Sequence, residues 1–406
     1  MTTKEHFHAL DNLRAVMMWL GIVLHAGVAH VVRPLPNITW HDTATTLGAD
    51  TLVLGIHAFR MPVFFILAGF FVALLCQRYG PRGMLRHRLR RIGLPFAVFW
   101  PVLFAAMTVS LAVYHGLMTT GRPWSDPWAL PTPAAGDRIG TYHLWFLYLL
   151  LGYCLVVAAA ALGVERIPAH WRRSGARLGL RIATRWWGLP VLMIPLIVAG
   201  LPYERGVVVV YFSFFPHASV WLYHGAFFAF GLFVYHHRHE LLARYQRHWR
   251  GLGAAGLASF LTALTLFDLA ERAEGHPGHL YTLAAVGYAA SSWLGSFALI
   301  GLFQRVLGQP RPWLQYVADS SFWVYLVHLP VVVLTGAVLY ARDWSPWLKM
   351  GLNVMVTTAV CLVTYQLLVR HTAIGVLLNG RRGGRYPAGA ASAHATVGEN
   401  RVSAQR

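Results

Sequence analysis

The chain has few cysteines and few charged residues for its length. Its three cysteines, Cys76, Cys154 and Cys361, are isolated within apolar stretches, which argues against a disulfide framework and against a cysteine-based metal site. Only 12% of the 406 residues are charged, whereas 56% are hydrophobic. Because a soluble domain of this size does not need so much apolar sequence, the composition excludes an ordinary soluble enzyme and predicts an integral membrane protein.

Acidic residues are scarcer than basic ones: 15 Asp and Glu accompany 34 Lys and Arg, which gives a formal net charge of +19. A charge of this sign can indicate a nucleic-acid partner. The basic residues, however, follow a pattern set by ten apolar segments. If both termini are cytoplasmic, the internal segments hold 26 of the 34 basic residues, and nine of the 15 acids are external. This asymmetry follows the positive-inside rule, so the charge reports orientation and no nucleic-acid partner is expected.

The apolar segments predict an all-α integral membrane protein with about ten transmembrane helices and both termini in the cytoplasm. The first run is too long for a signal-peptide core and lacks a small-residue cleavage site, so we expect it to be retained. We expect one membrane domain over residues 1–379. Large apolar residues then become rare, which predicts a disordered cytoplasmic tail over residues 380–406. The segments are 13–32, 51–76, 92–114, 141–161, 187–201, 216–235, 251–270, 280–303, 318–339 and 347–369.

Arg14 and His25 lie on the first of these segments, eleven positions apart. At 100° per residue this spacing is three turns plus about 20°, so both side chains project from one helix face. They are ~16 Å apart along the axis, which is about half of a bilayer core. We therefore expect a titratable histidine near mid-membrane above a cation at the membrane edge. It is either a functional group or a histidine bonded to a neighbouring helix, with Arg14 as a cytoplasmic anchor.

The second segment carries His57 and Arg60, three residues apart and so on one helix face. A guanidinium inside a membrane needs an anionic or strongly accepting partner. That partner is an acidic side chain, a set of backbone carbonyls such as those freed at Pro62, or a carboxylate on a substrate. No acid is predicted at the right depth, which favours a ligand carboxylate or a water-filled cavity. The nearest acids by sequence pattern, all closer to the membrane edges, are Asp50, Asp268 and Asp319.

Histidines occur at intermediate depths on four different segments, which predicts a polar interior. None of them has a histidine or carboxylate partner at i,i+4 spacing, so no metal site is expected. An acid–base system fits better, since imidazole exchanges a proton near neutral pH. Further polar side chains are interface anchors, interhelical hydrogen-bonding groups or ligand contacts. The histidines are His25, His57, His224 and His328; the further side chains are His143 and Trp145, near the external surface, and Ser321 and Tyr325, on the segment of His328.

The densest basic cluster follows the second segment on its cytoplasmic side. In part, these basic residues are explained as a topology signal that contacts lipid headgroups. Arginine also binds phosphate oxygens in pairs, so the cluster can hold a phosphorylated nucleotide. Its members are Arg78, Arg82, Arg86, Arg88, Arg90 and Arg91.

Several motifs resemble membrane acyltransferase family 3. The first is LDNLRA at residues 10–15, followed after ten further residues by His25. Residues 57–69 (HAFRMPVFFILAG), 143–147 (HLWFL) and 320–328 (SSFWVYLVH) resemble the glucans biosynthesis protein C branch of that family. Members of this branch place succinyl groups on osmoregulated periplasmic glucans. The resemblance extends from about residue 7 to about residue 370.

The resemblance implies a ten-helix, multi-pass protein of the bacterial inner membrane. It also implies acyl-CoA as the cytoplasmic donor and a periplasmic glucan or other glycan as the acceptor, with no permanently bound cofactor. Many family members have a Gly-Val-Asp-type element where this chain has residues 59–62 (FRMP), as in the glucan branch. This departure fits succinyl-CoA better than acetyl-CoA, because Arg60 can pair with a distal carboxylate.

The expected site follows from these patterns together. The family's functional Arg and His correspond to Arg14 and His25. Transfer to a glycan hydroxyl is the leading hypothesis, with His25 as general base or transient acyl carrier. A glycan or anion transporter and an O-acetyltransferase of another cell-surface glycan are the alternatives. The expected catalytic residues are His25, His57, Arg60 and His328; the expected donor-binding residues are Arg14, Arg82, Arg86, Arg88, Arg90 and Arg91; the expected acceptor-binding residues are His143, Trp145 and Tyr325.

Overall fold

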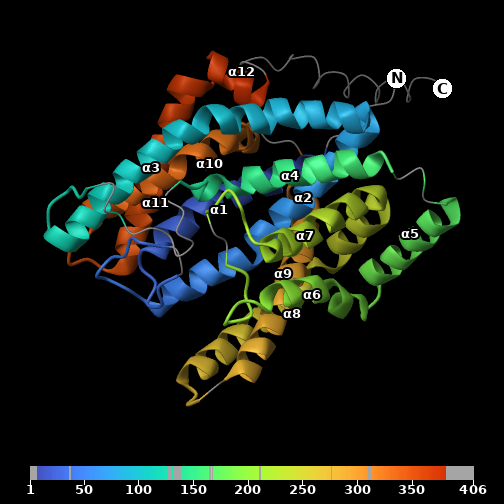
Figure 1. The fold of residues 1–406 in the computed structure, drawn as a ribbon, viewed down its shortest axis with the longest axis horizontal. Helices are drawn as coiled ribbons and strands as arrows, with labels where there is room; N and C mark the ends of the chain where they lie inside the picture. The colour runs from blue at the N-terminus through green and yellow to red at the C-terminus, as the bar shows by residue number, and fades with distance from the viewer. Residues whose placement is uncertain are drawn as a thin grey trace, which may run out of the picture.

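The computed structural model describes residues 7–35, 38–126, 130, 139–163, 166, 168–209, 212–275, 277–309 and 312–380. Over these ranges the chain is helical and has no β-strand, and long helices pack side by side around α1 (Figure 1). The predicted all-α class is therefore confirmed. The predicted tail beyond Gly380 lies outside the described residues.

Each of the ten apolar segments overlaps one helix. Within the described ranges, seven helical stretches are long and apolar enough to cross a membrane, and one of them, Leu47–Thr120, contains both α2 and α3. An eighth is obtained if α5 and α6, which meet at 97°, form one bent span. The count of ten and the cytoplasmic termini stay predictions. The helices are α1 (His8–Val28), α2 (Leu47–Arg88), α3 (Leu94–Thr120), α4 (Trp145–Ala161), α5 (Ala169–Thr184), α6 (Gly188–Gly200), α7 (Ala218–His236), α8 (Arg238–Arg272), α9 (Gly278–Val306), α10 (Pro312–Leu339), α11 (Pro346–Thr364) and α12 (Ala373–Asn379).

The first helix ends earlier than the apolar run predicts. α1 stops at Val28 rather than near Val32, so His25 lies in its last turn. The chain leaves the helix because the next residues bond to the segment that leads into α2: the amide of Asp42 donates to Ala29 O, and the ring of His30 lies 2.8 Å from Ala44 O. The helix is uninterrupted between Arg14 and His25, as their predicted common face requires.

A buried ion pair holds this connection in place. Lys349 of α11 donates from Nζ to Oδ1 of Asp42 at 2.7 Å, and their side chains are 0% and 2% exposed. Removing one partner from such a pair leaves an uncompensated buried charge. The pair therefore fixes the segment between α1 and α2 against α11.

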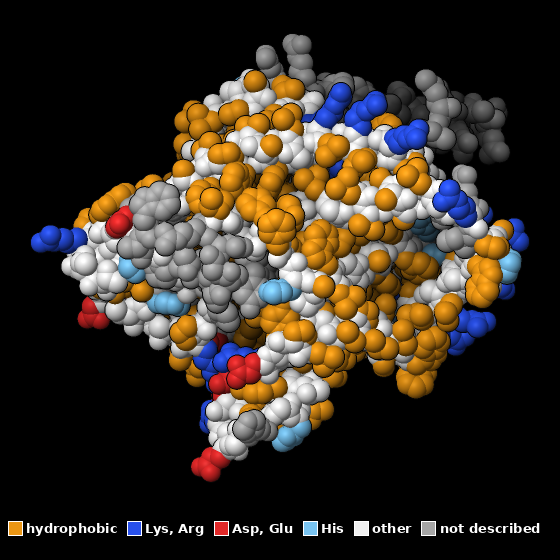
Figure 2. Space-filling model, in the orientation of Figure 1, with side chains coloured by type: hydrophobic (Ala, Val, Ile, Leu, Met, Phe, Trp, Pro, Cys, Tyr) orange, Lys and Arg blue, Asp and Glu red, His pale blue; other side chains and the backbone are white. Residues whose placement is uncertain are grey.

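α2 is held closely against α7. A Cβ on Gly69 would overlap with Phe228 O, and one on Gly231 would overlap with Ile66 O. Only glycine permits this separation of the two backbones. On the face of the molecule seen in Figure 2, hydrophobic side chains are abundant in the middle, and most of the visible Lys and Arg side chains lie along the top and the right edge, with others at the left edge and near the bottom.

Candidate active site

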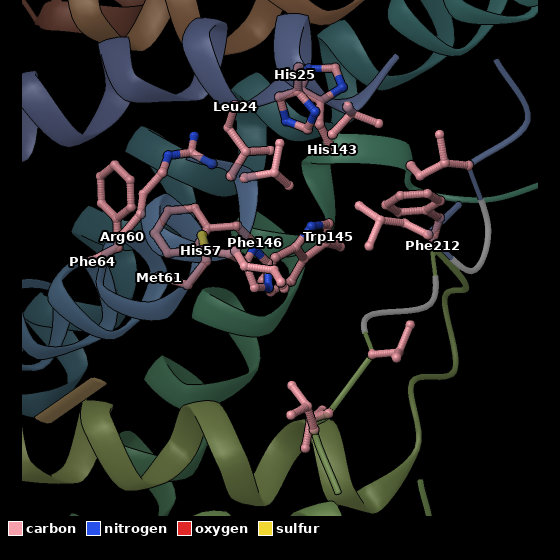
Figure 3. A pocket seen from close by; sticks show the side chains of 18 of the residues that line it. Leu24, His25, His57, Arg60, Met61, Phe64, His143, Trp145, Phe146 and Phe212 are labelled. Atoms are coloured by element: carbon pink, nitrogen blue, oxygen red, sulfur yellow. The ribbon is translucent and has the colours of Figure 1, made fainter. Parts of the chain in front are cut away.

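A cavity of about 200 Å³ opens among α1, α2, the start of α4, α10 and the loop between α6 and α7 (Figure 3). It brings together seven of the predicted site residues from four separate parts of the sequence. The lining also contains residues that the sequence did not indicate, chiefly Tyr288 of α9, Phe212 and the stretch 207–209. The seven are His25, His57, Arg60, His143, Trp145, Tyr325 and His328.

The cavity has two distinct ends. Arg60 and Phe212 lie on opposite sides of it, with His25 and His143 between them (Figure 3). Arg60 contacts α1 at Met17, about 12 Å along the helix from His25 on the side of Arg14. Leu35 and Ile38, from the connection after α1, line the cavity as well. Along α1 the order is therefore Arg14, the contact of Arg60 with Met17, and then His25 in the last turn.

Arg60 is 6% exposed and is held by α1. Its Nε donates to Met17 O at 2.9 Å, and its guanidinium lies 5.7 Å from the centroid of Phe64. A Cβ on Gly21 would overlap with Nη2, so this glycine makes the room that the guanidinium occupies. No acidic side chain in the described part of the chain forms an ion pair with it. A carbonyl partner was one of the expected alternatives, but it comes from α1 rather than from the break at Pro62.

His143 is fixed by a proline in another helix. Pro330 has no N–H, so the carbonyl of Leu326 lacks its usual donor within α10. His143 Nε2 donates to that carbonyl at 2.9 Å, and Tyr325 Oη donates to His143 O at 2.7 Å. Because a carbonyl only accepts, the proton of a neutral His143 is on Nε2 and Nδ1 carries the lone pair. That Nδ1 is buried and has no partner among the described residues.

His328 is fixed in the opposite tautomer. Its Nδ1 lies 3.0 Å from Val324 O and 2.8 Å from Tyr325 O, so Nδ1 donates and Nε2 carries the lone pair. This Nε2 is also buried without a partner in the part that the structure describes. The His328 ring lies 5.3 Å from the rings of both His25 and His143, measured between centroids. The site thus holds two neutral imidazoles with known acceptor atoms beside His25.

His25 completes this cluster from α1. Its Nδ1 is buried and unbonded within the described residues. The His328 ring is 5.3 Å away and Nε2 of a neutral His328 can only accept, so we assign the proton of a neutral His25 to Nδ1, although no hydrogen bond joins the two rings in the structure. Nε2 of His25 is then the lone-pair atom available to the cavity, which is the state that a general base requires.

His57 and Trp145 line the cavity, but His224 does not. The His224 ring stacks on Phe65 at 4.7 Å and lies 5.1 Å from Trp145. It is 2% exposed. The predicted polar interior therefore holds three of the four intermediate-depth histidines, with the fourth packed behind an aromatic wall.

The arginines predicted to bind the donor do not form one group. Arg14 is half-exposed, forms a 3.3 Å ion pair with Asp11 and lies over Phe71. Arg88 is near enough to Arg14 for their charges to interact, and its buried Nε has no partner in the described chain. Arg91 instead donates to the carbonyls of Val376 and Leu377 in α12. The exposed members are Arg82, Arg86 and Arg90.

Among the described residues no group of three or more His, Cys, Asp or Glu side chains has the arrangement of a metal site. No sequence pattern pointed to Met17 O, Gly21 or Tyr288, because their role depends on which helices lie side by side. The proline at 330 was visible in the sequence, but the partner of the carbonyl that it frees was not.

Comparisons with known proteins identify the family of the chain. Residues 7–366 match the family model described as an acyltransferase domain. The chain is 24% identical to glucans biosynthesis protein C of Salmonella gallinarum over 395 residues, which cover 93% of this chain and 95% of the relative. The corresponding proteins of Salmonella heidelberg and Shigella dysenteriae are equally similar, with the same coverage. No solved structure matches the chain significantly.

The family match covers almost the whole helical region and favours an enzyme over the transporter alternative. The matched range includes the motif that carries Arg14 and His25. It also includes the seven predicted site residues that line the cavity. The chain therefore belongs to acyltransferase family 3, and the protein is a multi-pass membrane O-acyltransferase.

Proposed function

We propose that this enzyme moves a succinyl group from succinyl-CoA in the cytoplasm to a hydroxyl group of a periplasmic glucan, within the bacterial inner membrane. The relatives named glucans biosynthesis protein C support the acceptor. The observation that carries the chemistry is the cluster of three histidines, His143 and His328 buried and His25 partly buried, that shares one cavity with Arg60. The orientation follows from the basic internal segments, with both termini cytoplasmic.

His25 acts as the base in this proposal. Its Nε2 removes the proton of the acceptor hydroxyl as the oxygen attacks the thioester carbonyl carbon. The new C–O bond forms, the C–S bond breaks, and the proton passes from His25 to the leaving thiolate. The products are the glucan ester and CoA. His328 supports this step because its acceptor Nε2 favours the Nδ1–H tautomer of His25.

A variant of this mechanism makes His25 a transient acyl carrier. Its Nε2 then attacks the thioester itself, and the acceptor hydroxyl attacks the acyl-imidazole in a second step. Rapid-quench mass spectrometry in the absence of acceptor distinguishes the two, because only the second route adds the acyl mass to the protein.

The succinyl carboxylate is assigned to Arg60. This guanidinium uses Nε for Met17 O, which leaves its two terminal nitrogens for a ligand. Arg60 contacts α1 at Met17, between Arg14 and His25. In this proposal, an acyl chain that enters from the cytoplasmic side therefore passes Arg60 before it reaches His25. A carboxylate there supplies the anionic partner that no described side chain provides.

Replacement of the base tests the proposal. His25→Ala should retain the thermal stability of the wild type but lose acyl transfer by at least about 100-fold, the typical contribution of a general base. Purified protein in nanodiscs, supplied with succinyl-CoA and glucan, reports free CoA and product mass. His236→Gln is the matched control, because this exposed histidine bonds within α7 and is outside the cavity lining. Wild-type rates in a well-folded His25→Ala protein would remove the assignment.

Donor binding is assigned to Arg14 and Arg88 rather than to the whole basic cluster. These two lie near each other and near the start of α1, and Arg88 has a buried, unbonded Nε. Arg14→Ala and Arg88→Gln should each raise KM for acyl-CoA about 10-fold with a smaller effect on kcat, since a charged hydrogen bond contributes about 1.5–3 kcal/mol. Arg82→Gln is the exposed control. An unchanged donor KM in both variants would leave the cluster with a role in topology alone.

A further inference from the structure

His143 has a hydrogen-bonding capacity that the proposed transfer step does not use. The residue is 5% exposed and lines the cavity; its Nε2 donates to Leu326 O, and its Nδ1 has no partner among the described residues. Figure 3 shows the ring beside that of His25, between Arg60 and Phe212. A buried acceptor without a donor is unfavourable, so this atom points to a ligand group or a water.

The unbonded ring nitrogens in the cluster can be assigned one by one. Nδ1 of His25, Nδ1 of His143 and Nε2 of His328 are all buried without partners among the described residues. The carbonyl contacts make the atoms of His143 and His328 acceptors. No hydrogen bond joins His25 to either acceptor in the structure, and a neutral His25 has one N–H, which can serve only one of them. The His328 ring is the one at 5.3 Å from His25, so we assign this N–H to His328, and Nδ1 of His143 is the acceptor that remains.

The two substrates differ in what they can offer to that acceptor. A succinyl thioester carries a carboxylate and a carbonyl near the reacting carbon, and both groups only accept hydrogen bonds. Their match in the cavity is the donor-rich guanidinium of Arg60. A sugar carries several hydroxyl groups, and each can donate. The acceptor atom of His143 therefore matches the sugar.

We propose that His143 Nδ1 accepts a hydrogen bond from a second hydroxyl of the sugar, next to the one that His25 deprotonates, so that the enzyme selects an acceptor with two adjacent hydroxyl groups. The proposal rests on the proposed function and adds a requirement to it. The His25 and His143 side chains come from α1 and from the turn before α4, and both lie next to His328. A second hydroxyl on the sugar supplies the donor that His143 Nδ1 lacks, whereas a sugar with a single hydroxyl leaves this atom unbonded.

The test compares acceptors that differ by one hydroxyl. Full-length protein in nanodiscs is given succinyl-CoA with methyl β-glucoside or with its 2-, 3-, 4- or 6-deoxy analogue, and CoA release and product mass are followed. One analogue, which lacks the reacting hydroxyl, should give no ester at the normal position. A second analogue, which lacks the adjacent hydroxyl, should lose about 10- to 100-fold in kcat/KM, since it leaves a buried acceptor unpaired.

Two substitutions assign the effect to His143. His143→Gln keeps a donor for Leu326 O but places no acceptor at the Nδ1 position, so the penalty for the second analogue should shrink to less than about threefold. His143→Asn keeps an acceptor near the Nδ1 position and should retain more of the penalty. His236→Gln should show the full wild-type penalty. The ratio of two acceptors within one variant is insensitive to the fraction of folded protein.

The outcomes separate this inference from the function on which it rests. No CoA release with any acceptor, by wild-type protein, would overturn both. Transfer at similar efficiency to all analogues that retain the reacting hydroxyl would overturn the two-hydroxyl requirement alone. A penalty that persists unchanged in His143→Gln would show that another group recognises the second hydroxyl.

Discussion

The side chain of Arg60 is held in one position by its neighbours, although none of the described acidic side chains forms an ion pair with it. Its guanidinium has one backbone carbonyl, one aromatic face and the notch at Gly21, and no described acid pairs with it. A buried charge with so little compensation is costly. The sequence predicted the need for a partner from the depth of Arg60. It could not predict Met17 O, because the register between α1 and α2 is a property of their packing.

Arg60→Met should depress succinyl transfer far more than acetyl transfer. A charged hydrogen bond in a low-dielectric cavity contributes about 1.5–3 kcal/mol, so the succinyl-to-acetyl ratio should fall about 10- to 100-fold. Arg60→Lys should restore the ratio only in part, since a point charge cannot reproduce the planar fork. The ratio is measured with both acyl-CoA donors on monodisperse protein. Equal loss of both activities would mean that Arg60 serves the fold and does not select the donor.

At the scale of the helix, a proline in α10 couples two elements of the site. Pro330 leaves Leu326 O without a helical donor, and His143 takes its place from the turn before α4. Proline inside a helix normally weakens it by ~3 kcal/mol. Here the carbonyl that Pro330 frees accepts from His143 and so sets the tautomer of this cavity histidine. The break in the helical hydrogen bonding therefore has a role in the site.

Pro330→Ala should therefore stabilise α10 and impair the enzyme. The new N–H at position 330 competes for Leu326 O, so His143 loses its fixed orientation and its fixed tautomer. We expect a thermal midpoint equal to or above that of the wild type, with transfer reduced about 10-fold or more. Pro195→Ala, at an interior proline of α6 outside the cavity lining, is the matched control and should not reduce transfer. Full activity with a raised midpoint would show that the bond to His143 is dispensable.

The sequence predicted the helices better than their ends and their contacts. Apolar length located all ten segments, and spacing placed Arg14 and His25 on one face. The end of α1 was wrong by four residues, because the turn after Val28 depends on bonds to Asp42 and Ala44 far along the connection. No sequence pattern predicted that the stretch 207–209 lines the cavity. The position of a loop residue depends on the path of the chain, whereas periodicity predicts only which face of a helix or strand a residue lies on.

For the whole molecule, the proposed function requires access to His25 from both sides of the membrane. Arg14 and Arg88 lie toward one end of α1, while Leu35, Ile38 and Phe212 line the cavity on the side of the connecting loops. In the proposed reaction, a donor and an acceptor from different compartments meet at His25. This requires that the basic end of the helices is cytoplasmic, which the charge asymmetry predicts and the helix lengths alone do not test.

The orientation can be tested with single cysteines in a variant that lacks Cys76, Cys154 and Cys361. Glu274→Cys, between α8 and α9, should react with a membrane-impermeant maleimide in intact spheroplasts. Ser174→Cys, on the exposed α5, should react only after the membrane is permeabilised, because α5 belongs to the arginine-rich side. Each variant must first transfer acyl groups at the wild-type rate, which shows that the protein is inserted normally. Labelling of Ser174→Cys in sealed spheroplasts would show that the topology is the reverse of the predicted one. Arg14 and Arg88 would then lie on the side of the membrane that lacks acyl-CoA.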